Sequence, residues 1–132
     1  MPETAVSDAT TRGVRIQVQP SYVPERSAPR QGQYFFAYRV RISNVGDETV
    51  QLVSRHWVIT DGEGRVEHVR GPGVVGEQPV LSPGQSFEYT SFCPLPTPLG
   101  AMHGSYQMVT ADGARFDAEI AHFSLAVPTA LN

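Results

Sequence analysis

The sequence contains no lysine: its ten basic residues other than histidine are all arginine. This absence excludes a Schiff-base lysine and the lysine of a phosphate-binding loop. The single cysteine, Cys93, cannot form a disulfide within the chain, which favours a reducing compartment. No apolar run approaches the roughly 20 residues that cross a bilayer, and residues 1–5 show neither the charged nor the apolar region of a signal peptide. We therefore expect a soluble, cytoplasmic protein.

Charge of either sign is also scarce. The 10 arginines and 13 acidic residues leave a formal net charge of −3, which gives no general attraction to nucleic acid or to a membrane surface, so neither is expected as a partner. The 132 residues, 40% of them hydrophobic, suit one globular domain that needs no disulfide or metal. Residues 1–12 are small and polar and are interpreted as a flexible N-terminal leader. Residues 13–128 are predicted to form the single folded domain.

Apolar and polar residues alternate in several short segments, and no segment of 11 residues shows a helical period. The alternation predicts strands over 14–18, 34–43, 49–60, 65–69, 87–91, 102–110 and 115–127, with a short extended piece at 79–81. The apolar phase changes near Ser54 or Arg55, and again between Ile120 and Phe123, which indicates two β-bulges. Seven or eight short strands separated by turn residues predict an all-β fold, an antiparallel β-sandwich. Trp57 is expected in its core.

The segment Gly71–Gly76 imitates the spacing of a dinucleotide-binding fingerprint. That fingerprint requires a strand, a tight turn and then a helix whose N-terminus faces pyrophosphate. Pro79 and Pro83 leave no room for such a helix, and Pro72 removes a backbone donor. We therefore predict an inter-strand loop whose glycines supply positive φ angles.

One function of this loop stays open from the residues alone. Arg70 lies beside Gly71, Gly73 and Gly76, whose exposed amides could hold a small anion such as pyrophosphate or a nucleotide phosphate. These four residues are the candidate ligand-binding residues.

A proline-rich stretch, Pro94–Gly100, is predicted to be an ordered or extended loop, because each proline lacks a backbone donor. Four apolar residues in and around it form a candidate partner-binding loop: Phe92, Leu95, Leu99 and Met102. The alternative is that the loop packs over one end of the sandwich.

Catalytic patterns are missing from the sequence. The four histidines are far apart and lack the spacing typical of metal ligands, although His103 and His122 lie on the last two predicted strands and could approach each other. Cys93 precedes a proline rather than a helix that could lower its pKa, and no G-x-S-x-G elbow is present. We predict no catalytic residue, no metal ligand set and no cofactor.

Four blocks of sequence are long enough to compare with known families: Ser54–Asp61 (SRHWVITD), Val69–Pro79 (VRGPGVVGEQP), Ser82–Ser91 (SPGQSFEYTS), and Pro94–Pro98 (PLPTP) followed by Met102–Met108 (MHGSYQM). Over about residues 14–126 the chain resembles the bacterial ApaG family. The resemblance implies a fibronectin type III/immunoglobulin-like sandwich and no established enzymatic activity. In that family the gene commonly neighbours that of a diadenosine tetraphosphate hydrolase, and a member has been linked to cobalt resistance and magnesium efflux. Related domains in a eukaryotic F-box protein and in a protein that interacts with DNA polymerase delta imply protein binding.

Three functions follow as hypotheses. The first is a non-enzymatic binding module for an unidentified protein partner, acting as a monomer or homodimer. The second is a small-anion binder that uses the glycine-rich loop. The third, a metal-dependent hydrolase of dinucleotide polyphosphates, needs clustered ligands that the sequence does not display.

Overall fold

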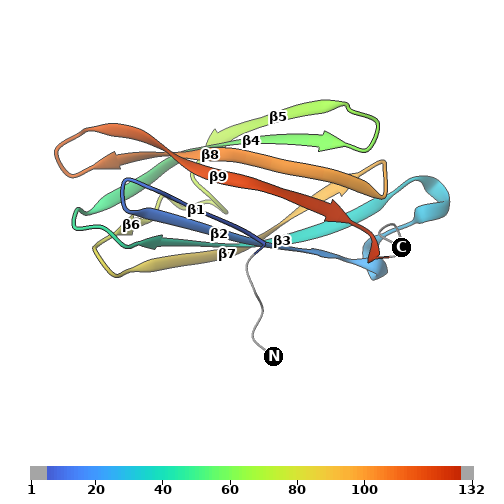
Figure 1. Cartoon of the computed structure of the whole chain (residues 1–132), viewed down its shortest axis with the longest axis horizontal. Coiled ribbons are helices and arrows are strands. Elements are labelled where there is room, and N and C mark those ends of the chain that lie inside the picture. The colour runs from blue at the N-terminus through green and yellow to red at the C-terminus, as the bar shows by residue number, and fades with distance from the viewer. Residues whose placement is uncertain (1–5, 129–132) are drawn as a thin grey trace.

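Two antiparallel sheets pack face to face in the computed structural model, which describes residues 6–128 (Figure 1). The first sheet has the strand order β1-β2-β3-β7, and the second has the order β5-β4-β8-β9, with β6 paired to β4. The strands are β1 (Ser7–Thr11), β2 (Val14–Tyr22), β3 (Tyr34–Asn44), β4 (Val50–Asp61), β5 (Val66–Pro72), β6 (Val80–Leu81), β7 (Ser86–Leu95), β8 (Leu99–Thr110) and β9 (Arg115–Ala126). Two short 3-10 helices, η1 (Pro24–Arg26) and η2 (Pro29–Gln31), connect β2 to β3. The sandwich prediction is confirmed, with nine strands in the described part rather than seven or eight.

The core forms where the alternating apolar residues of the two sheets meet. Along β3, the buried side chains are those of Phe36, Tyr38, Val40 and Ile42, so a period of two places them all on one face. Trp57 on β4 is 2% exposed, as predicted, and its ring meets Tyr38 edge-on at 5.2 Å. No helix among residues 6–128 is long and apolar enough to cross a membrane.

Strand β1 corrects the expectation of a flexible leader over residues 1–12. Ser7–Thr11 pairs with β2 through a tight turn at Arg12 and Gly13, both of which have positive φ angles. The strand was missed because it carries no run of apolar side chains; backbone pairing holds it, together with the Arg15–Asp8 ion pair. Residues 1–5 of the predicted leader lie outside the described part.

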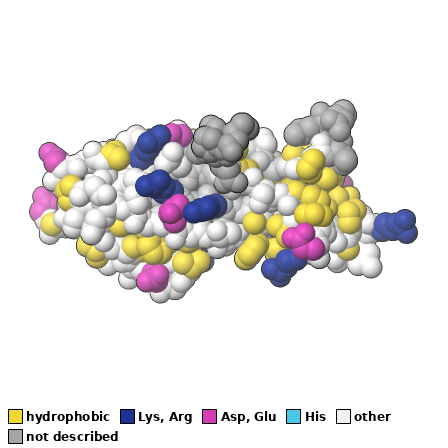
Figure 2. Space-filling model, turned by 90° about the horizontal axis from the view of Figure 1, so that it is seen from below, with side chains coloured by type: hydrophobic (Ala, Val, Ile, Leu, Met, Phe, Trp, Pro, Cys, Tyr) yellow, Lys and Arg dark blue, Asp and Glu magenta, His cyan; other side chains and the backbone are white. Residues whose placement is uncertain are grey.

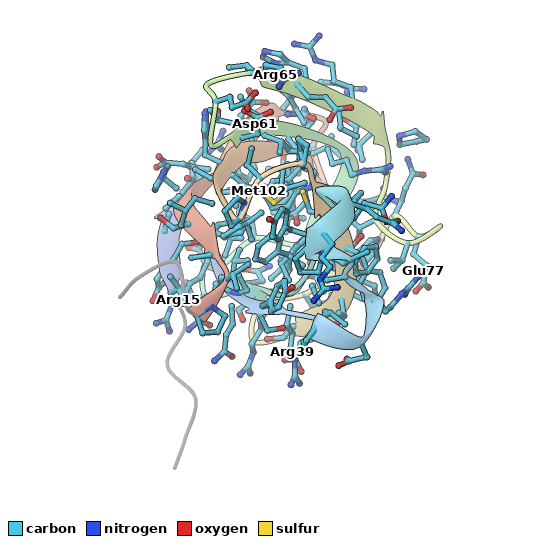
Figure 3. The ribbon with its side chains drawn as sticks, turned by 90° about the vertical axis from the view of Figure 1, so that its right-hand side faces the viewer. Arg15, Arg39, Asp61, Arg65, Glu77 and Met102 are labelled. Atoms are coloured by element: carbon cyan, nitrogen blue, oxygen red, sulfur yellow. The ribbon has the colours of Figure 1, made fainter. Side chains whose placement is uncertain are left out.

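One long side of the sandwich is closed and the other is open. On the closed side, β1 and β9 approach each other, and the Glu119 amide donates to Thr11 Oγ1 at 3.1 Å. On the open side, the edges are β5 of one sheet and β7 of the other. Figure 3 views the molecule from its η1/η2 end: Met102 lies between the layers, Glu77 projects on one side, and Arg15 lies towards the other.

Both predicted bulges are present. The register between β4 and β8 shifts between Leu52 and Ser54, which places the extra residue at Val53, next to the predicted position. The register between β8 and β9 shifts between Met102 and Gly104, with the extra residue on β9.

Strand β7 corrects the prediction for the proline-rich stretch. The strand continues through Pro94 to Leu95, and β8 begins at Leu99, so only residues 96–98 remain as a connection. The prediction failed because it treated a proline as a break, whereas an edge strand accepts proline where the missing N–H would face away from its neighbour.

Candidate binding groove between strands β5 and β7

A groove lies between the two edge strands on the open side. Its deeper part has a volume of about 280 Å³ and is lined by Tyr38, Arg55, Trp57, Ile59, Glu67, Val69, Ser91, Phe92, Cys93, Pro94 and Met102. A shallower hollow is lined by Ile59, Asp61, Arg65, Val66, Glu67, Pro94, Leu95 and Pro96. The two share Ile59, Glu67 and Pro94, so they form one continuous surface, which we call the β5–β7 groove.

The floor of the β5–β7 groove is apolar and chemically inert. It reaches the core at Trp57 and Met102, both nearly fully buried. Burial raises the pKa of the Cys93 thiol to about 11, so the thiol stays protonated at neutral pH. Burial likewise raises the pKa of the Tyr38 hydroxyl above its ordinary value. These groups suit contact with an apolar side chain better than proton transfer or nucleophilic attack.

Four charged side chains line the groove, Arg55, Asp61, Arg65 and Glu67, and Asp61 is paired with Arg65. Among the described residues, Glu67 takes part in none of the ion pairs. The guanidinium of Arg55 also lines the groove, but its Nη1 already donates to the carbonyls of Pro72 and Gly73, at 2.9 and 2.8 Å. The groove therefore offers one available carboxylate beside an apolar floor.

The β7 border of the groove carries a row of backbone groups without a strand partner. The Asn44 amide donates to the Gln85 carbonyl at 2.9 Å, and bonded pairs alternate along the antiparallel β3–β7 ladder. The backbone groups of Ser86, Glu88, Thr90 and Phe92 therefore point away from β3. Pro94 falls in the same series, so its missing N–H costs the sheet no hydrogen bond.

The β5 border is built in the same way. The Gly73 amide donates to the Val53 carbonyl at 2.8 Å, and the Asp61 amide donates to the Arg65 carbonyl at 3.0 Å. The alternation then directs the backbone groups of Val66, His68 and Arg70 away from β4. Pro72 ends this row, as Pro94 ends the row on β7.

An aromatic patch adjoins the groove on the outer side of β7. The rings of Phe35 and Phe92 lie 5.4 Å apart, and the guanidinium of Arg26 lies over both, at 4.3 and 5.3 Å from their centroids. Phe92 remains 48% exposed. Figure 2 shows hydrophobic side chains gathered towards the η1/η2 end of this face, with charged side chains over its middle. We call Arg26, Phe35 and Phe92 the aromatic patch.

The glycine-rich loop, which follows β5, forms a tight hydrogen-bonded turn. Val74 and Glu77 exchange two backbone hydrogen bonds, at 2.8 and 2.9 Å, around Val75 and Gly76, both of which have positive φ angles. Gly73 has a φ of +58°, and a Cβ there would lie 2.2 Å from the Glu77 carbonyl oxygen. The chain thus runs from a strand into a tight turn and on to β6, not into a helix.

This arrangement leaves few amides for an anion. The amides of Gly73, Val74 and Glu77 donate to protein carbonyls, and Pro72 has none. Arg70 lies directly opposite His56 in the β4–β5 register, on the outer face of the sheet rather than over the loop. The structure therefore does not gather Arg70, Gly71, Gly73 and Gly76 into one cradle.

The structure divides the predicted partner-binding residues. Phe92 and Leu99 are 48% and 41% exposed, as a contact surface requires. Leu95 and Met102 are 5% and 1% exposed, since inward positions of β7 and β8 direct them to the core, so they are not part of an exposed loop and meet the surface only as lining of the two hollows of the groove. Sequence reasoning missed Arg55 and Glu67. The β4–β5 register sets Arg55 opposite Gly71 and Glu67 opposite Ile59, so the two side chains lie on the same face of the hairpin, four positions apart.

Two histidine pairs lie on the second sheet: the β8–β9 register sets His103 across the bulge from Ala121 and His122, as the sequence suggested, and a second pair was not foreseen. His56 Nε2 and His68 Nδ1 lie 2.9 Å apart on the outer face of β4 and β5. Desolvation, followed by the positive charge of Arg70, lowers the pKa of His56. Within residues 6–128, no three or more His, Cys, Asp or Glu side chains are grouped to hold a metal ion.

Comparison with known proteins gives a consistent result. Residues 24–110 match the family described as the ApaG domain. The chain is 58% identical over 117 residues to Protein ApaG of Bordetella pertussis, covering 89% of each chain. It is 59% identical over 120 residues to Protein ApaG of Methylobacterium sp. strain 4-46, covering 91% of this chain and 92% of that protein.

Solved structures agree with these matches. The crystal structure of an ApaA protein from Bordetella pertussis superposes with a TM-score of 0.86 at 58% identity, covering 87% of this chain and 94% of that one. The C-terminal domain of Wzt, with a TM-score of 0.52 and 15% identity, covers 91% of this chain and 76% of that one and shares the fold alone.

Proposed function

The chain belongs to the ApaG family, and we propose that it is a non-enzymatic binding module that recognises a protein partner through the β5–β7 groove. The observation that carries the proposal is the composition of this one side of the molecule. A groove with an apolar floor, two strand edges with unpaired backbone groups and a half-exposed aromatic side chain, Phe92, lie together there. Strand edges with unpaired backbone groups offer hydrogen-bonding groups for pairing with another chain.

The chemistry of the groove supports binding rather than catalysis. A catalytic site would require a nucleophile or a general base with a pKa suited to neutral pH. The thiol in the groove, Cys93, has a pKa raised to about 11, and Tyr38 is shifted in the same direction. The negative charge of Glu67 raises the thiol pKa further instead of activating the thiol.

The anion-binding alternative has weaker support. Its cradle would need the amides of the glycine-rich loop, three of which are already bonded within the protein. The third hypothesis, metal-dependent hydrolysis, would need a ligand group, and the described residues contain none of three or more side chains. Binding to a partner protein would account for the family's link to cobalt resistance and magnesium efflux better than metal binding by these side chains.

Position-specific photocrosslinking in the source cells tests the proposal. A benzophenone amino acid replaces Phe92 or Val66 beside the groove, and replaces Val45 or Val80 as controls elsewhere. The replaced valines are matched in exposure, at 56% for Val66, 59% for Val45 and 57% for Val80. We expect the same protein adduct from both groove positions, its loss when Val69→Arg blocks the groove, and no such adduct from the controls. Equal labelling from all four positions, or no adduct from either groove position, would contradict the proposal.

A further inference from the structure

We propose that the partner enters the β5–β7 groove as an extended peptide that adds a strand to the free edge of β7. This inference rests on the proposed function and specifies the chemistry of the occupant. The edge of β7 presents N–H and C=O groups at Glu88, Thr90 and Phe92 in the spacing of a β-ladder. A peptide that satisfies them extends the first sheet on its open side.

The geometry of the closed side explains why addition occurs at this border. The opposite edge of the same sheet, β1, is covered by β9, to which Thr11 is hydrogen-bonded. Edge strands with unpaired backbone groups invite pairing with another chain, and proteins commonly blunt them with proline or charge. On β7 the proline is placed only at position 94, after the row of free groups, so it limits the length of the added strand without preventing addition.

The period of two along the added strand defines which side chains the peptide needs. Side chains directed inward extend the row of Ser91 and Cys93 and enter the groove, where Val69 and Trp57 form apolar walls. A volume of about 280 Å³ accommodates an aliphatic or phenyl side chain there. The next inward position lies towards the Glu67 carboxylate, which favours lysine or arginine.

Outward side chains of the same peptide meet different surroundings. They lie beside Thr90 and Phe92 and continue the aromatic patch, in which Arg26 already covers the rings of Phe35 and Phe92. An apolar or aromatic residue is favoured at this position. The expected motif is therefore a short extended segment with apolar residues on both faces and one cationic residue on the inward face. This pattern differs from the apolar spacing of an amphipathic helix.

An N-methyl scan of a selected peptide tests strand addition. A random 12-residue phage library is selected on the immobilised full chain, and binders that are lost on Val69→Arg are made synthetically. Each peptide amide is then methylated in turn. Because methylation removes one backbone donor, we expect affinity to fall roughly tenfold at every second residue and to change little between them.

Matched proline variants provide the second readout. Thr90→Pro removes an outward donor from β7, and His68→Pro removes the equivalent donor from β5; both leave their in-sheet hydrogen bonds intact, which melting curves check. We expect Thr90→Pro to weaken peptide binding roughly tenfold and His68→Pro to leave it within about twofold. Groove-dependent binding without a period of two, or with equal losses in the two variants, overturns strand addition while the proposed function stands. Failure to recover any peptide that depends on the groove counts against both.

Discussion

Replacement of Gly73 by alanine should destabilise the protein far more than the same change at Gly76, although both glycines have left-handed backbone angles. The φ angles are +58° and +80°, so each alanine incurs about 1–2 kcal/mol of left-handed strain. Loss of chain entropy in the unfolded state returns about 0.4–1 kcal/mol in both variants. A Cβ at Gly76 has no heavy atom within 4 Å, so the net loss there is about 1 kcal/mol.

At Gly73 a steric clash adds to the loss of stability. The new Cβ would lie 2.2 Å from the Glu77 carbonyl oxygen, which must move by roughly 1 Å to reach ordinary contact. That movement breaks the two hydrogen bonds between Val74 and Glu77, each contributing about 0.5–1.5 kcal/mol. We expect a total loss of about 3 kcal/mol, or a melting temperature about 12 °C lower, against about 4 °C for Gly76→Ala.

Urea unfolding followed by the fluorescence of Trp57, together with thermal melts, measures both variants. Equal losses for Gly73→Ala and Gly76→Ala would refute the assignment of Gly73 as the glycine that steric contact requires. A gain in stability from Gly76→Ala would refute the left-handed strain.

Three further outcomes are expected. Burial raises the pKa values of Tyr89 and Tyr106, whose hydroxyls are hydrogen-bonded to each other. The tyrosines of the unfolded state therefore ionise first, and the free energy of unfolding should fall as the pH rises above about 10. Urea titrations between about pH 9 and 11 should show a smaller fall in Tyr106→Phe than in the parent, and equal falls would contradict this. The pKa of Cys93 is raised from 9.0 to about 11, so its thiol should react with a disulfide reagent at pH 8 at least about a hundredfold more slowly in the native protein than in guanidinium. Comparable rates would show that the thiol is not buried. Val75→Asn should raise the free energy of unfolding by about 0.5 kcal/mol in chemical denaturation, because asparagine tolerates the left-handed conformation of this turn better than a β-branched side chain. A lower free energy of unfolding would mean that the Val75 side chain stabilises the fold by packing more than its backbone strain destabilises it.

Much of the fold follows from local pattern. The period-two alternation located β3 and β9 within a few residues, and the changes of apolar phase revealed bulges that the β4–β8 and β8–β9 registers confirm. These features are local, because side-chain direction alternates along each strand whatever its neighbours are.

The groove could not be predicted in the same way. Its borders are β5 and β7, and only the pairing of β3 with β7 and of β4 with β8, strands far apart in the chain, determines that these two are edges. The same knowledge was needed to see that Pro94 fits within a strand. Strand β1 escaped detection for a different reason, because backbone pairing rather than an apolar face positions it.

Exposure of the four apolar residues around the proline-rich stretch could not be predicted from their type. Phe92 and Leu99 are exposed as expected, whereas Leu95 and Met102 have the same apolar character but point inward. Composition alone does not distinguish these two pairs. The role of Arg55, which holds the carbonyls of Pro72 and Gly73, depends on a hairpin register that brings residues 17 and 18 positions apart into contact.

The most direct test of the central claim is a map of backbone amide shifts in the isotopically labelled protein during titration with a groove-selected peptide. The account predicts that the largest changes fall on residues 66–70 and 88–93, with the indole of Trp57 shifting in parallel and residues of β1 and β9 unchanged. Changes centred on the closed side, or on the outer histidine face around His56 and His103, would contradict it.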